Sequence, residues 1–112
     1  MIEIESLKQI IVSWAKTLPY NVKIHVFGSY LKGKKNPTDI DISLELLHTF
    51  SKVQRTILWG DHHSEWEDYL SQTIGYTIHL CLFEGADSPK MIQNLKDGSL
   101  LLYDSNEKEA GT

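Results

Sequence analysis

The chain has 112 residues, of which 41% are hydrophobic and 23% charged, and its formal net charge is −4 at pH 7. This composition fits one globular domain and excludes a disordered chain. An acidic chain is poorly suited to general nucleic-acid binding, which depends on many Lys and Arg contacts to phosphates. Its only cysteine, Cys81, excludes an intrachain disulfide and suits a reducing compartment.

From the sequence we expect no targeting or membrane-spanning segment. Met1 to Glu5 lacks the basic start and the apolar core of a signal peptide. No apolar run approaches the roughly 20 residues that a membrane helix needs. We therefore expect a cytoplasmic protein without membrane contact, with one domain over residues 1–104 and a polar, disordered tail over 105–112.

The first elements follow from the spacing of apolar residues. Residues 6–18 repeat them at steps of three and four, which predicts a helix that Pro19 ends. Residues 22–27 alternate apolar and polar side chains, which predicts a strand. Residues 30–32 favour a turn of helix, and residues 33–37 favour a loop.

The next strand is expected over residues 38–46. Because side chains of a strand alternate between its faces, one face carries Asp39, Asp41 and Ser43. The other face carries the apolar Ile40, Ile42 and Leu44.

Two helices are then predicted. The first covers residues 49–59 and ends at Gly60. Ser64 and Glu67 have the spacing of a capping box, which predicts a second helix from about 65 to 73.

The remaining elements are a strand over residues 76–83, a short helix over 89–95 and a final apolar strand or extended segment over 100–103. Together these predict an α/β (α+β) fold: a small mixed β-sheet with helices on one face and the other face partly open.

Two short motifs lie where the first strand ends and the second begins. Gly28 lets a backbone approach a phosphate closely, and Ser29 adds a hydroxyl donor. Asp39 and Asp41 project from one face of the following strand, where two carboxylates repel each other unless a cation lies between them. Mg²⁺ takes one or two carboxylates and completes its shell with phosphates and water. The combination predicts a site for a metal-bound polyphosphate.

Three lysines, Lys32, Lys34 and Lys35, lie between the two motifs. They are placed to balance the charge of a triphosphate. A solvated basic loop with no ligand explains them equally well.

These residues resemble the DNA polymerase beta-like nucleotidyltransferase superfamily, in particular its minimal nucleotidyltransferases. The matching pattern is Val26-Phe27-Gly28-Ser29, then Gly33, then Thr38-Asp39-Ile40-Asp41. The likeness extends along most of the chain, and the segments 91–98 and 101–103 look like the usual family ending.

The resemblance implies transfer of a nucleoside monophosphate, AMP above all, from ATP or another NTP to a hydroxyl of a protein or small molecule. It implies two Mg²⁺ ions at Asp39 and Asp41, and contacts from Gly28 and Ser29 to the β- and γ-phosphates. Some minimal members are antitoxins that inactivate a helical HEPN toxin by adding AMP to a tyrosine.

Two positions depart from the family pattern. Active members carry a third carboxylate on a later strand, and the equivalent place here presents His79, while Glu84 lies outside the strand alternation. His79 is a candidate to take the proton of the attacking hydroxyl. The alternative is a degenerate site that binds a nucleotide or a protein partner without turnover. In the second departure, Tyr30 stands where the family often has Arg.

The remaining histidines and the tryptophans are further candidate functional groups. We expect His62 and His63 to lie in an ordinary loop rather than a metal site, because neighbouring side chains point apart. His25 is a candidate ligand contact on the open sheet face. The three tryptophans are expected to pack between helices, with a homo-oligomer contact as the alternative; they are Trp14, Trp59 and Trp66.

Overall fold

A computed structural model describes residues 2–32, 39–47, 51–85 and 88–105. Helices and strands follow in the order α1 (Ile4–Thr17), β1 (Val22–Phe27), β2 (Asp39–Leu46), α2 (Lys52–Ile74), β3 (Thr77–Leu82), α3 (Pro89–Asp97) and β4 (Ser99–Asp104). The four strands form one mixed sheet in the order β3-β2-β1-β4, in which only the pair β2 and β3 is parallel. The expected mixed sheet and fold class are confirmed.

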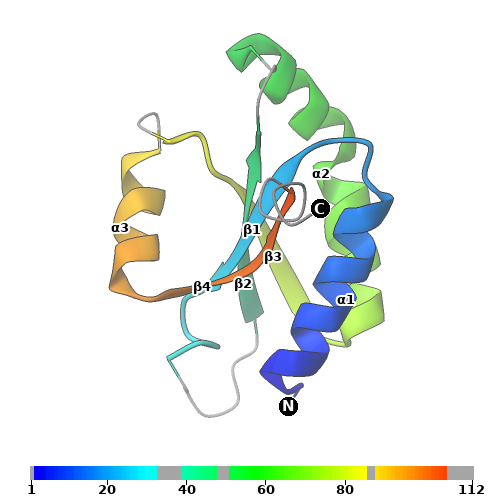
Figure 1. The fold of residues 1–112 in the computed structure, drawn as a ribbon, viewed down its shortest axis with the longest axis vertical. Coiled ribbons are helices and arrows are strands. Elements are labelled where there is room, and N and C mark those ends of the chain that lie inside the picture. The colour runs from blue at the N-terminus through cyan, green and yellow to red at the C-terminus, as the bar shows by residue number, and fades with distance from the viewer. Residues whose placement is uncertain (1, 33–38, 48–50, 86–87, 106–112) are drawn as a thin grey trace.

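One face of the sheet carries the core. Helices α1 and α2 lie along this face, whereas α3 lies on the opposite side (Figure 1). The helices and the sheet meet through apolar side chains that are almost fully buried, among them Leu7, Ile11, Ile24, Ile42 and Leu70. Helices were expected on one face of the sheet only. Helices α1 and α2 lie on that face, and α3 partly covers the other face.

Helix α2 differs from its prediction, because one helix replaces two. It runs through Gly60 without a break and is capped by Ser51, whose side chain accepts a hydrogen bond from the Gln54 backbone. A glycine inside a helix costs only about 1 kcal/mol relative to alanine, so tertiary contacts later in the helix override it. The predicted loop at His62 and His63 is likewise wrong, since both lie within α2.

The predicted capping box at Ser64 is wrong for the same reason. Glu67 instead accepts a hydrogen bond from the Leu80 backbone at 2.9 Å, and the Ser71 hydroxyl accepts one from the Ile78 backbone at 3.0 Å. These α2 side chains satisfy backbone donors on the outer edge of β3, which would otherwise be open to another strand.

The last described residue, Ser105, packs against the start of β1. Ser105 is buried, and its hydroxyl accepts a hydrogen bond from the Val22 backbone at 3.0 Å. Residues 106–112 of the expected tail lie outside the described residues, as do Gly33, Lys34, Lys35 and Thr38. No helix in the described part of the chain is long and apolar enough to span a membrane.

Candidate functional site

The two aspartates lie on one face of β2, as the alternation predicted. Ile40, between them, is fully buried toward the helices, so Asp39 and Asp41 project to the opposite face. Asp41 is paired with Phe27 of β1, the last residue before the Gly-Ser turn. The antiparallel hairpin therefore places the carboxylates beside the turn.

Gly28 and Asp41 are in direct contact. A Cβ atom added to Gly28 would clash with Asp41 Oδ2 and would lie 3.3 Å from Asp41 Cγ. Gly28 also has a φ of +81°, in the left-handed region that favours glycine. The turn continues with a hydrogen bond of 3.2 Å from the Lys32 backbone to the Gly28 carbonyl. Glycine is thus favoured at this position by the backbone, and a side chain there would displace the carboxylate of Asp41.

His79 is the third side chain at this site. In the parallel pairing of β2 and β3 it is the partner of Asp41. Its Nε2 lies 3.3 Å from Asp39 Oδ2, and both side chains are about half exposed, at 53% and 44%. The structure therefore brings Asp39, Asp41 and His79 together next to Gly28.

The surroundings of Asp41 disfavour the ionised form of its carboxyl. Burial raises the pKa of the Asp41 carboxyl, His79 acts in the opposite direction, and the charge of Asp39 raises it further. Within the described ranges no group of three or more His, Cys, Asp or Glu side chains is arranged to hold a metal ion. The donors present are two carboxylates, which is the set that Mg²⁺ uses when a substrate phosphate supplies further ligands.

The next row of residues on the same face contains a polar group that the sequence analysis did not single out. Ser43 is fully buried, and its Oγ has no hydrogen-bond partner among the described residues. It is flanked by His25 on β1 and Cys81 on β3. Burial lowers the pKa of His25, with Lys23 acting in the same direction, so the ring favours the neutral form. The alternation of side chains in β2 could have identified Ser43, because it places this hydroxyl on the same face as the two aspartates.

The structure shows what Glu84 and Tyr30 contact. Glu84 does not reach the aspartates, because it pairs with Arg55 of α2 at 3.4 Å. Tyr30 is buried, and its hydroxyl donates a hydrogen bond to the Ile2 carbonyl at 2.8 Å. Tyr30 thus ties the Gly-Ser turn to the start of the chain. Neither partner was predicted, since both contacts join segments that are far apart in sequence.

The histidines and tryptophans of α2 serve packing. His63 stacks on Trp59 and His62 stacks on Trp66, each with ring centroids 5.3 Å apart. Trp66 also meets Trp14 of α1 edge to face at 6.1 Å. The two histidines thus contact different tryptophans, and Trp14 and Trp66 pack between the helices as predicted.

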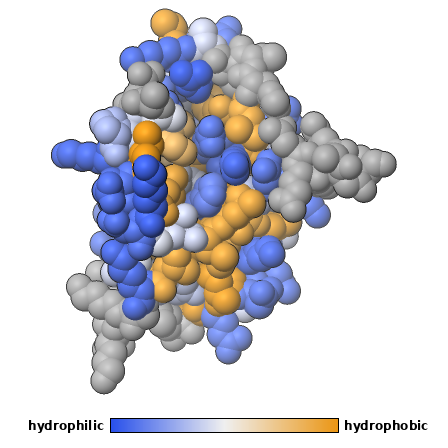
Figure 2. Space-filling model, turned by 60° about the vertical axis from the view of Figure 1, so that its left-hand side comes forward, coloured by the Kyte–Doolittle hydropathy of each residue, from blue (hydrophilic) through white to orange (hydrophobic). Residues whose placement is uncertain are grey.

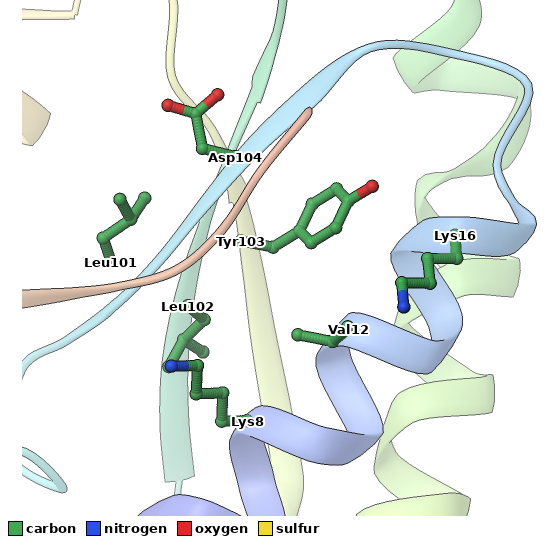
Figure 3. Close-up of a pocket in the computed structure, with 7 residues that line it drawn as sticks. All are labelled: Lys8, Val12, Lys16, Leu101, Leu102, Tyr103 and Asp104. Carbon is green, nitrogen blue, oxygen red and sulfur yellow. The ribbon is translucent and has the colours of Figure 1, made fainter. Parts of the chain in front are cut away.

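Two hollows lined by described residues lie away from the carboxylates. One of about 460 Å³ lies between α1 and β4, lined among others by Lys8, Lys16 and Tyr103 (Figure 3). Another of about 650 Å³ adjoins Tyr30 and Leu31. On the α3 side of the molecule, brought forward in Figure 2, hydrophobic and hydrophilic areas alternate across the face. The aspartates therefore do not line either of these hollows.

Similarity to known proteins is found at the level of the fold. No protein-family model and no curated protein sequence matches the chain. Among solved structures, it is similar to a toxin–antitoxin crystallised with AMP-PNP, with 20% identity and a TM-score of 0.64 over 92% of this chain and 77% of the other. It is similar also to a tri-AMPylated Shewanella oneidensis HEPN toxin in complex with an MNT antitoxin, with 19% identity and a TM-score of 0.61 over 95% and 76%.

A third solved structure, the toxin–antitoxin MntA–HepT, has 17% identity and a TM-score of 0.60 over 95% of this chain and 77% of the other. At such identities the likeness concerns the fold. The chain has the mixed α/β, nucleotidyltransferase-like fold found in these toxin–antitoxin structures.

Proposed function

We propose that this chain is a magnesium-dependent nucleotidyltransferase of the minimal type, which transfers AMP from ATP to a hydroxyl of a protein and acts as an antitoxin in the cytoplasm. The observation that carries the proposal is the contact between Asp41 and Gly28, with Asp39 beside it. This contact joins the two motifs of the resemblance at one place. The neighbours that hold AMP-PNP or an AMPylated HEPN toxin support ATP as the donor and a HEPN-type toxin as the acceptor.

Each residue of the site has a proposed role. Asp39 and Asp41 hold Mg²⁺, which when bound neutralises charge on the triphosphate. The backbone at Gly28 and the hydroxyl of Ser29 contact the phosphate oxygens. Lys32 is exposed at the end of the turn and adds positive charge near the same phosphates.

His79 has the proposed role of proton acceptor. The acceptor hydroxyl oxygen forms a bond to the α-phosphorus of ATP, the bond to the β-phosphate oxygen breaks, and pyrophosphate leaves. The hydroxyl proton passes to the His79 imidazole, which Asp39 orients through the 3.3 Å contact.

One observation favours a second function, in which the site binds a nucleotide without turnover. A second Mg²⁺ would need a third carboxylate, and His79 stands in that place opposite Asp41. An imidazole is a poor ligand for Mg²⁺, which prefers oxygen. Under this alternative the chain neutralises a toxin by binding it.

Label transfer distinguishes the two functions. The chain is incubated with Mg²⁺, α-labelled ATP and a HEPN toxin, alone and as Asp41→Ala and His79→Ala variants. Transfer that both substitutions abolish supports the enzyme, and Asp68→Ala, a change of an exposed aspartate on α2, serves as the matched control.

Binding is measured separately from transfer. A ligand that binds only the folded state raises the melting temperature, so Mg-ATP should stabilise the parent chain but not Asp41→Ala. An unchanged melting temperature of the parent at millimolar Mg-ATP would contradict both functions. Stabilisation without transfer would support the binding function.

A further inference from the structure

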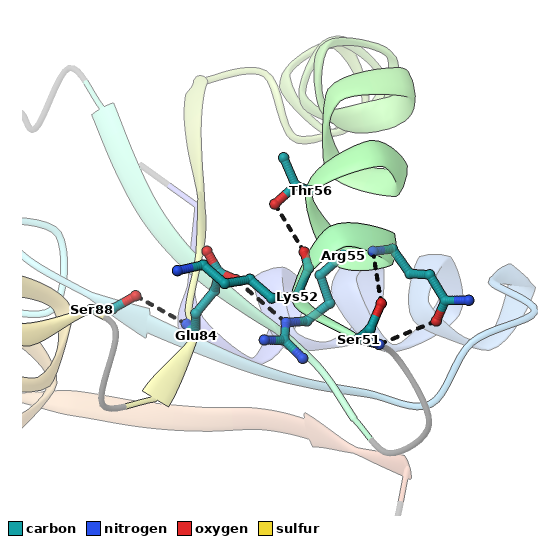
Figure 4. Close-up of polar contacts among 7 residues, drawn as sticks. Ser51, Lys52, Arg55, Thr56, Glu84 and Ser88 are labelled. Carbon is teal, nitrogen blue, oxygen red and sulfur yellow. Dashed lines mark hydrogen bonds and ion pairs between the residues drawn. The ribbon is translucent and has the colours of Figure 1, made fainter.

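The two outer edges of the sheet differ in their cover. Side chains of α2 accept hydrogen bonds from two backbone N–H groups of β3, at 2.9 and 3.0 Å. At the end of β3, Glu84 pairs with Arg55 of α2, and its backbone N–H donates to the Ser88 hydroxyl at 3.0 Å (Figure 4). Strand β4 is the opposite edge, and no further strand of the described chain pairs with it. Such an edge offers backbone donors and acceptors to an added strand.

A hollow of about 460 Å³ lies along this open edge, between α1 and β4 (Figure 3). Its helix side consists of Lys8, Val12 and Lys16, which recur at steps of four residues and therefore form one row along α1. Both lysines are exposed, and Val12 between them is partly buried. We call these three residues the lysine row. On the strand side the hollow is lined by residues 101–104.

The lysine row carries positive charge in a chain whose formal net charge is −4. Neither Lys8 nor Lys16 forms an ion pair with another described residue. Asp104 also lines the hollow, but it lies opposite Lys23 of β1, and its carboxylate points away from the lysine row (Figure 3). The hollow therefore presents two positive charges that an acidic partner can neutralise.

The spacing of the lysine row fits an extended chain. Helix α1 follows β4 along the hollow (Figure 3). Eight residues of a helix rise about 12 Å, which is the separation of Lys8 and Lys16 along α1. Residues i and i+4 of a strand share a face and lie about 13 Å apart. A strand added to β4 therefore places two carboxylates opposite the lysines and its residue i+2 opposite Val12.

We propose that the open edge of β4 binds an acidic extended segment of a partner protein, which joins the sheet as a fifth strand. The segment has an acidic residue at i, an apolar residue at i+2 and an acidic residue at i+4. Its backbone pairs with β4, its carboxylates face the lysines, and its apolar side chain contacts Val12. This pattern reads the same in both directions, so it suits a parallel or an antiparallel strand.

The same charges disfavour a second copy of this chain at this edge. Two β4 strands paired edge to edge about a twofold axis would bring two lysine rows side by side on one face, where like charges repel. A bulge at Leu102, which has no partner in the register with β1, also bends this edge. The bulge limits the partner to a short segment, so we expect weak and reversible binding.

Peptide titration followed by ¹⁵N–¹H NMR of the full chain tests the proposal. The probe is the peptide Thr-Glu-Thr-Val-Thr-Glu-Thr with blocked ends, and a comparison peptide has Lys in place of both Glu. The Glu peptide should shift the backbone amide signals of residues 101–104 and of the lysine row, whereas the Lys peptide should not. Absence of these shifts at millimolar Glu peptide overturns the proposal.

Charge reversal tests the lysine row. The double variant Lys8→Glu, Lys16→Glu should weaken binding of the Glu peptide about tenfold or more, since it replaces two attractive contacts by repulsive ones. The matched control is Lys90→Glu with Lys96→Glu, which makes the same change of net charge at exposed residues of α3. Because charges beyond about 10 Å are screened, the control should keep its affinity. Equal weakening in both double variants contradicts the proposal, and circular dichroism checks their folds.

Backbone methylation of the peptide tests the added strand. Alternate N–H groups of a strand point to opposite edges, so one set would face β4 and the other solvent. Two versions of the Glu peptide carry N-methyl groups on one set or on the other. One version should lose binding and the other should retain it. Equal binding of both versions would show that the peptide does not pair with β4.

This inference stands apart from the proposed function. Asp41→Ala should bind the Glu peptide like the parent chain, whether or not the parent transfers AMP. Dilution of the free chain, followed by the same NMR signals, tests a second copy as the occupant. Unchanged signals of residues 101–104 agree with an edge that is free for a partner. Signals that shift on dilution would place a second copy on the edge and overturn the proposal.

Discussion

The two faces of strand β2 differ in what their side chains contact. Toward the helices, Ile40, Ile42 and Leu44 are fully buried and hold the sheet to α1 and α2. Toward the other side, Asp39 and Asp41 face the Gly-Ser turn and His79. The core and the candidate site thus lie on opposite faces of one strand, and a change on one face should affect mainly the property of that face.

The largest effect is expected from the helix side. Ile42→Ala removes a fully buried side chain and leaves a cavity, which should lower the free energy of unfolding by about 2–5 kcal/mol. Asp39→Ala, on the other face of the same strand, should change it by less than about 1 kcal/mol, because its side chain is 44% exposed. Urea unfolding of both variants measures the contrast. Equal losses would contradict the separation of the two faces.

An intermediate effect is expected at the turn. Gly28→Ala forces a side chain into the left-handed region, at about 1–2 kcal/mol, and also displaces the Asp41 carboxylate. Gly75→Ala is the matched control, because Gly75 has a φ of +87° but open space around it. Gly28→Ala should therefore lower the free energy of unfolding more than Gly75→Ala. If Gly28→Ala lowers the free energy of unfolding no more than Gly75→Ala does, the Asp41 side chain moves aside without an energetic cost.

The smallest effect is expected from the charge of Asp41. Its pKa in the folded state is raised above the ordinary 3.8, so the folded state binds more protons than the unfolded state between these two values. The ionised carboxylate therefore destabilises the metal-free fold at neutral pH, and Asp41→Asn should be the more stable protein there.

The pH series fixes the sign of this effect. With a chelator present, the advantage of Asp41→Asn in urea unfolding should shrink as the pH falls through the raised pKa, and disappear below 3.8. Added Mg²⁺ should favour the parent instead, if Asp41 is a ligand. An advantage that grows on acidification would show that the carboxylate stabilises the fold.

Sequence reasoning was most successful where the signal is local. The alternation in β1, β2 and β3 predicted which side chains enter the core and which face the turn, because a strand has a period of two. It was least successful in α2, where a glycine and an apparent capping box suggested two helices. One helix is favoured because Trp66 and Leu70 are buried and Glu67 accepts a hydrogen bond from the Leu80 backbone. None of these contacts can be recognised from a short stretch of sequence.

The sequence by itself determined that Asp39 and Asp41 share a face and that a Gly-Ser turn precedes them, since both follow from local backbone geometry. Only the tertiary structure decided that Asp41 lies against Gly28, that Glu84 pairs with Arg55, and that Val53 and Ile57 of α2 are exposed among the described residues. Contacts of this second kind join residues far apart in the chain. They depend on how strands pair and how helices pack, which local propensity does not fix.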